Sequence, residues 1–193
     1  MPFEIFDFSL YKPHGETSLL ELKDKVTKAD LYRMTDEAVA AAESILVNAN
    51  DADVVFVPND PEARDIVTGA TDGWTIGHVV VHATASSEEA AAHALLLARG
   101  APIPPEVRTR YETPWESITT IAQARIRLDE SKRMRHAMFD AWPDEPHLDA
   151  ILDHPFFGQF NAIGRYMIGL GHEVGHLDQL RETLRQSIAA HTR

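Results

Sequence analysis

Apolar residues recur every three to four positions along four long segments of the chain, which is the pattern of amphipathic α-helices. The segments cover about residues 17–50, 74–99, 115–141 and 158–190, with a break expected near Lys28. In the last segment the repeating apolar residues are Ile163, Met167, Leu170, Val174, Leu177, Leu180, Leu184 and Ile188. Four helices of this length, joined by long connections, predict an all-α fold, a four-helix bundle with crossover connections.

Proline, glycine and short polar residues predict where these helices start and stop. Thr71 or Asp72 is the expected N-cap of the second helix, and Gly100 with the prolines that follow it ends that helix. The run at 54–57 predicts a short extended segment. Residues 1–16, which are rich in aromatic side chains, predict an N-terminal arm that packs onto the helices.

Length and composition favour one domain. With 193 residues, of which 44% are hydrophobic, the chain is able to bury one full core, so we expect a single helical domain over residues 1–193. No stretch reaches the roughly 18 uninterrupted apolar residues of a membrane span. The N-terminus also lacks a basic segment followed by an apolar one. We therefore expect a cytoplasmic protein that has no membrane partner.

The charge and the cysteine content exclude several classes of function. A formal net charge of -12 opposes binding to nucleic acid, which requires a basic surface. Cysteine is absent, which removes disulfides, thiolate ligands and a cysteine nucleophile. Any metal site must therefore use His, Asp or Glu, and the chain contains 10 histidines.

The strongest chemical signal is a pair of histidines in the fourth helix, His172 and His176. Residues four apart lie on the same helix face and are able to chelate a single ion. The segment from 172 to 176 also satisfies the HExxH pattern of zinc proteases, with Glu173 in the place of the general base. We disfavour the protease interpretation, because apart from the terminal His191 no convincing third ligand follows His176.

A third ligand is expected from the second helix, where His78 and His82 have the same spacing. Each glycine inside a helix costs about 0.5 to 1 kcal/mol relative to alanine, and the fourth helix contains several of them. They are Gly164, Gly169, Gly171 and Gly175. We attribute them to the close approach of a neighbouring helix, which would bring a histidine of the second helix to the first pair.

Two segments together resemble the DinB/YfiT-like family. In the segment from 74 to 83, Trp74 stands near the helix start and His82 follows eight residues later, as in the family's second-helix signature. The segment from 172 to 180 reads His-x-x-x-His-x-x-Gln-Leu and is similar to the family's last-helix motif. Asp178 departs from the family pattern, in which many members carry glycine before the glutamine.

The resemblance implies a four-helix bundle with one metal centre held by His82, His172 and His176. The expected cofactor is one divalent ion, zinc or nickel first, with iron and manganese as further candidates. Because related proteins transfer low-molecular-weight thiols or are described as metal-dependent hydrolases, we expect a thiol-dependent S-transferase or a hydrolase acting on a small molecule. Members are often dimers, so we also expect a homodimer.

The sequence leaves several roles open. Three histidine ligands leave a coordination position at which a water or a thiol loses its proton more easily. His78, Gln179 and Glu173 are candidates for contacts with the ligand rings or with a substrate. If His78 closes the site as a fourth ligand, the alternative is a non-catalytic metal-binding or stress-related helical protein. A bundle without metal is the third alternative.

Overall fold

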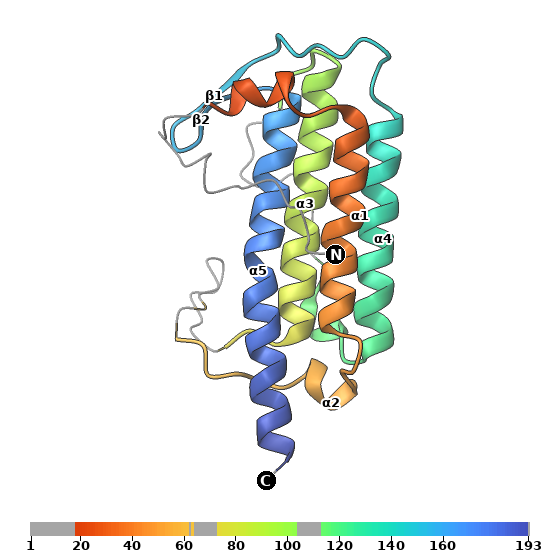
Figure 1. Cartoon of the computed structure of the whole chain (residues 1–193), viewed down its shortest axis with the longest axis vertical. Coiled ribbons are helices and arrows are strands. Elements are labelled where there is room, and N and C mark those ends of the chain that lie inside the picture. Colours follow the sequence, from red (N-terminus) through yellow and green to blue (C-terminus); the bar gives the residue numbers. More distant parts are fainter. Residues whose placement is uncertain (1–17, 62, 64–72, 104–112, 193) are drawn as a thin grey trace.

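The structure is a computed structural model that describes residues 18–61, 63, 73–103 and 113–192. In this part of the chain, four long helices run along a common axis and form a bundle (Figure 1). They are α1 (Lys28–Ile45), α3 (Ile76–Ala98), α4 (Ile121–Asp140) and α5 (Ala162–His191). The shorter elements are the 3-10 helices η2 (Leu19–Asp24) and η3 (Trp115–Ser117), helix α2 (Asp51–Val54) and strands β1 (Leu152–His154) and β2 (Gly158–Phe160). The all-α bundle prediction is confirmed.

Capping side chains explain where the first two long helices begin. Thr27 caps α1 and forms a capping box with Asp30, which produces the break that the sequence predicts near Lys28. Thr75 caps α3 by accepting a hydrogen bond from the His78 backbone N–H at 3.1 Å. The prediction of a cap at Thr71 or Asp72, both outside the described residues, is therefore wrong.

The predicted starts of the last two helices are too early by several residues. Trp115–Ser117 is a separate 3-10 turn, and α4 begins only after Thr120, whose side chain forms a capping box with Gln123. Residues 158–160 belong to β2, and α5 begins after Asn161. Periodicity alone does not separate a helix from a short element that precedes it, whereas the caps do.

The segment before α5 is a small antiparallel hairpin that the sequence did not predict. Leu152 lies opposite Phe160, and His154 lies opposite Gly158, which has a positive φ of 68°. The hairpin lies at the same end of the bundle as η2, while α2 lies at the other end (Figure 1). The prediction of an extended segment at 54–57 is wrong at its start, because Val54 ends α2.

Helices α3 and α5 lie side by side, and small residues permit their contact. A Cβ atom added at Gly169 would lie 2.2 Å from the Cβ of Ala90, so the close approach expected from the sequence is confirmed there. At Gly175 an added Cβ would meet nothing within 4 Å, and at Gly164 it would meet Phe160 at 2.9 Å in β2. The same explanation is therefore wrong for these two glycines.

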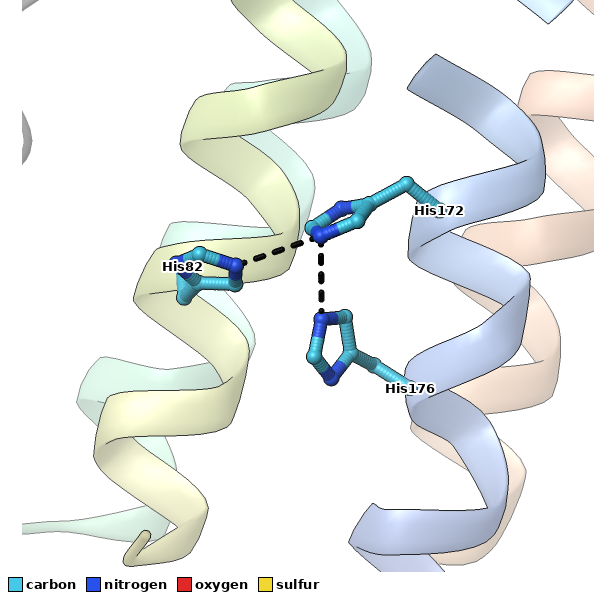
Figure 2. A group of neighbouring side chains, drawn as sticks. All are labelled: His82, His172 and His176. Atoms are coloured by element: carbon cyan, nitrogen blue, oxygen red, sulfur yellow. Dashed lines mark hydrogen bonds between the residues drawn. The ribbon is translucent and has the colours of Figure 1, made fainter. Parts of the chain in front are cut away.

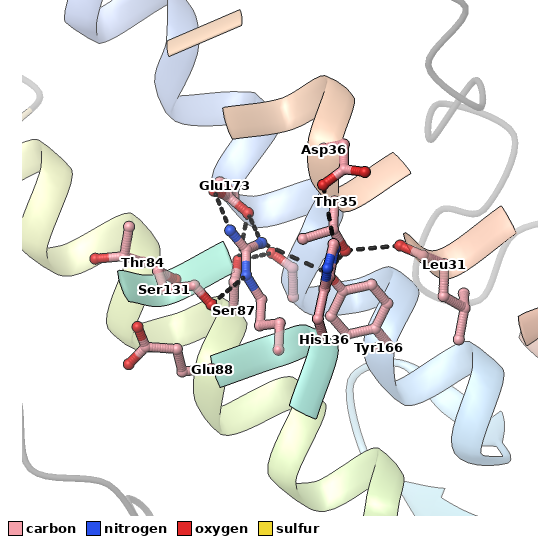
Figure 3. Close-up of polar contacts among 12 residues, drawn as sticks. Leu31, Thr35, Asp36, Thr84, Ser87, Glu88, Ser131, His136, Tyr166 and Glu173 are labelled. Carbon is pink, nitrogen blue, oxygen red and sulfur yellow. Dashed lines mark hydrogen bonds and ion pairs between the residues drawn. The ribbon is translucent and has the colours of Figure 1, made fainter. Parts of the chain in front are cut away.

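Buried ion pairs connect α4 to α5 and to α3, and Figure 3 shows the contacts of Glu173. Arg135 of α4 lies 2.5 Å from the Glu173 carboxylate of α5, and Arg127 lies 2.5 Å from Glu88 of α3. Ser87 of α3 also donates a hydrogen bond to Glu173 at 2.8 Å. A buried charge is tolerated only when it is paired and hydrogen-bonded, so these contacts restrict how the three helices fit together.

Two further expectations concern the chain outside the bundle. The predicted N-terminal arm at 1–16 lies outside the described residues. Of the described helices, not one is both long and apolar enough to pass through a bilayer.

Candidate metal centre

Three histidine side chains from α3 and α5 point toward one another (Figure 2). His172 and His176 are one turn apart on α5, and His82 reaches them from α3. The Nε2 atom of His172 lies 3.3 Å from Nε2 of His82 and 3.2 Å from Nε2 of His176. The structure thus brings together the three residues that the sequence names as ligands.

These separations fit three ligands of a single ion. Two imidazole nitrogens that bind zinc at about 2.0–2.1 Å with a tetrahedral angle lie roughly 3.3 Å apart. In the described part of the chain, His82, His172 and His176 form the one group of three or more metal-binding side chains. His172 is exposed and the other two are half-buried, so the site is accessible to a small molecule. That the three bind a metal stays a prediction.

Gln179 and Asp60 fix the proton position on His176. The Gln179 side-chain N–H donates to the Asp60 carboxylate at 2.8 Å, which orients the amide oxygen toward Nδ1 of His176, 2.7 Å away. Nδ1 must therefore carry the proton and donate it to Gln179, and Nε2 keeps its lone pair for a metal. Burial lowers the pKa of His176, although the bond to Gln179 opposes this shift, and a lower pKa favours the neutral imidazole that metal binding requires.

Trp74 packs against the histidine cluster and separates His78 from it. The Trp74 ring contacts His82 edge-on at a centroid distance of 4.7 Å and stacks near His176 at 5.8 Å. His78 is buried between two indoles, stacking on Trp74 at 4.2 Å and on Trp115 at 4.7 Å. His78 is not a member of the group of three, so the fourth-ligand interpretation finds no support in the described residues.

Glu173 points away from the histidines, although it lies between two of them in sequence. Its carboxylate is buried in the bundle, where it pairs with Arg135 and accepts a hydrogen bond from Ser87 (Figure 3). The structure therefore does not place Glu173 where the general base of a HExxH protease acts, nor beside a ligand ring. Its charge is balanced by Arg135 within the core.

Two cavities border the cluster, and each is lined by one of its histidines. One, of about 410 Å³, is lined by His172, Arg165, Glu89, Ser86 and several apolar side chains. The other, of about 730 Å³, is lined by His176, Gln179 and Asp60. Both are large enough for a small molecule, and each includes one of the cluster histidines in its wall.

The fold and the site together place this chain in the class of helical bundles with a candidate three-histidine metal centre. Within that class, the chain belongs to the DinB superfamily, whose family model matches residues 31–180. The matched range contains all three cluster histidines and Gln179. Searches of curated proteins and of solved structures each returned no match.

Sequence reasoning missed two residues that contribute to this region. Asp60 comes from the proline-containing stretch before α3, 119 residues away from Gln179 in sequence. Arg165 lies on α5 seven positions before His172, which is a helical spacing that places both on one face. The spacing was a usable signal for Arg165, whereas no local pattern points to Asp60.

Proposed function

We propose that this protein is a metal-dependent enzyme in which His82, His172 and His176 hold one divalent ion and the reaction is the transfer of a small thiol. The observation that supports the proposal is that three imidazole nitrogens converge next to two cavities. The described residues do not add a fourth protein ligand to this group. Three protein ligands and an open position are typical of catalytic rather than structural zinc sites. A divalent ion in this site would lower the pKa of a water or a thiol that reaches it.

Thiol transfer is favoured over hydrolysis by the position of Glu173. Metal-dependent proteases of the HExxH type use that glutamate to remove a proton from water. Here Arg135 and Ser87 engage the carboxylate in the core, so it is not available for proton transfer at the site. A thiol already ionises more readily than water and therefore needs less help from a protein base. Hydrolysis is the second candidate, supported by solvent access to the exposed His172.

Elemental analysis of protein purified without a metal-affinity tag tests the metal centre. We expect about one equivalent of divalent metal in the wild type, and its loss in both His82→Ala and His172→Ala. His147→Ala is the matched control, because the His147 side chain is 59% exposed and stands outside the cluster. A wild type that stays free of metal after incubation with zinc, nickel, iron and manganese would overturn the proposal.

Activity is tested on protein that carries its metal. Thiol-transfer assays with low-molecular-weight thiols, run beside esterase and amidase assays, distinguish the two candidate reactions. Turnover that is lost in His172→Ala and retained in His147→Ala supports an enzyme. A full metal complement without turnover in any assay would favour the non-catalytic metal-binding alternative.

Zinc or nickel as the ion and a homodimer as the assembly are parts of the same proposal. The elemental analysis identifies the ion directly. Sedimentation at several protein concentrations determines the assembly, and a monomer at all of them would contradict the homodimer.

A further inference from the structure

Gly175 is a glycine in the middle of α5 that neither the backbone nor the packing of the described residues requires. The described glycines with a positive φ are Gly100 and Gly158, so Gly175 does not need the left-handed conformation. A Cβ atom added at Gly175 would meet no described atom within 4 Å, whereas one added at Gly169 would lie 2.2 Å from Ala90. A glycine inside a helix destabilises it relative to alanine. Gly175 therefore lowers the stability of α5, and the packing gives no reason for it.

Gly175 lies in the wall of a cavity, next to a histidine of the cluster. This cavity, of about 730 Å³, is lined by Gly175 and His176 and also by Trp74 and Gln179. Trp74 contacts the rings of two cluster histidines, His82 at 4.7 Å and His176 at 5.8 Å between ring centroids. Gly175 itself is exposed, so a molecule in the cavity is able to reach the backbone of α5 at this position.

The loop before α3 forms another part of the same wall, through residues that include Asn59 and Asp60. Hydrogen bonds join this loop to α5 at two glutamines. Gln179 donates to Asp60 at 2.8 Å, and Gln186 bonds to Asn59 at 2.8 and 3.1 Å. Gln179 lies about one turn, or about 6 Å, further along α5 than Gly175. The loop is therefore held at the two glutamines, while the surface of α5 at Gly175 stays uncovered.

We propose that Gly175 is a specificity-determining residue that leaves room for the substituent of the small thiol, whose sulfur would bind at the histidine cluster. The inference rests on the proposed function, since the thiol is the substrate proposed there. It assigns the substituent to the 730 Å³ cavity rather than to the 410 Å³ cavity. A side chain at position 175 would fill part of this space and weaken the binding of larger thiols, whereas the smallest thiols would bind as before.

Two neutral thiols of different size test this inference on zinc-loaded protein. Mercaptoethanol has a short substituent, whereas N-acetylcysteamine has an amide that makes the substituent longer. Both are titrated calorimetrically into the wild type, Gly175→Ala and Gly175→Leu. We expect the wild type to bind N-acetylcysteamine about tenfold more tightly, the effect of burying about two further carbon groups. This preference should fall in Gly175→Ala and be lost in Gly175→Leu, while mercaptoethanol binds all three proteins alike.

Gly171→Ala and Gly171→Leu are the matched controls. Gly171 also precedes a cluster histidine on α5, but it lines the 410 Å³ cavity. We expect both control variants to retain the preference for N-acetylcysteamine. The inference is overturned if the preference is unchanged in both Gly175 variants, or if the Gly171 variants lose it as much as the Gly175 variants do.

Two further measurements distinguish the role of Gly175 from other effects. Zinc content is measured for each variant, and a wild type that binds zinc but neither thiol contradicts the proposed function itself. Urea unfolding of the metal-free proteins should give a higher midpoint for Gly175→Ala than for the wild type, because alanine is the better helix former. A lower midpoint would overturn the inference, because the fold would then require Gly175.

Discussion

Removing the amide of Gln179 should weaken metal binding without removing a ligand. In Gln179→Leu, Nδ1 of His176 loses its acceptor at 2.7 Å, and nothing then holds the proton on that nitrogen. Partners of this kind typically contribute a factor of about 10 to 100 in metal affinity, or roughly 1.4 to 2.8 kcal/mol. Asp60→Ala should have a smaller effect in the same direction, because the amide is then free to turn its N–H groups toward His176.

The assay is a competition for zinc against a chromophoric chelator. Gln186→Leu is the matched control. Gln186 is also a glutamine of α5 and forms hydrogen bonds with Asn59 in the loop before α3. Its side chain bonds to Asn59 and Glu182 and to no histidine of the cluster. We expect Gln186→Leu to bind zinc with wild-type affinity. Equal affinities for Gln179→Leu and Gln186→Leu would refute the assigned role of Gln179 in holding the His176 proton.

Three other predictions concern the bundle. Arg135→Met leaves the buried Glu173 carboxylate without its ion pair and should lower the free energy of unfolding, measured in urea, by about 3–5 kcal/mol. Arg33→Met, which removes an exposed ion pair, should lower it by at most about 1 kcal/mol. Equal losses of stability in the two variants would contradict this prediction. Gly169→Ala should force α3 and α5 apart and weaken zinc binding, whereas Gly175→Ala, in open space, should leave it unchanged. His93 has its pKa lowered below 6.5 on folding, so the free energy of unfolding should fall as pH decreases from 7 to 5, and His93→Gln should flatten this slope.

The helical periodicity was sufficient to predict the bundle, but not the ends of its helices. The stripe of apolar residues continues from Trp115 through η3 into α4, so the predicted start is six residues too early. The start of α4 is defined by the hydrogen bond from the Gln123 N–H to the Thr120 side chain. The sequence contains this capping pattern, but an analysis of hydrophobic periodicity does not use it. The β1–β2 hairpin was missed because strands of three residues are too short to show alternation.

The candidate ligands could be named from sequence because two of them share a helix. The spacing of His172 and His176 establishes one face of α5, while the choice of His82 over His78 came from the family resemblance. The structure gives the physical difference between the two: His78 is enclosed by Trp74 and Trp115, and His82 faces α5. The stacking of Trp115 on His78 joins residues that are distant in sequence, so no local pattern encodes it.

The position of the cluster depends on other contacts of α5. Glu173 pairs with Arg135, and Gly169 lies against Ala90, so both the rotation and the height of α5 relative to α3 are restricted. A shift of α5 by one residue would move its side chains by about 1.5 Å along the axis and turn them by about 100°. Either change would separate His172 from His82 beyond the 3.3 Å that a shared ion requires. The buried ion pair and the small-residue contact therefore act on the site through the register of α5.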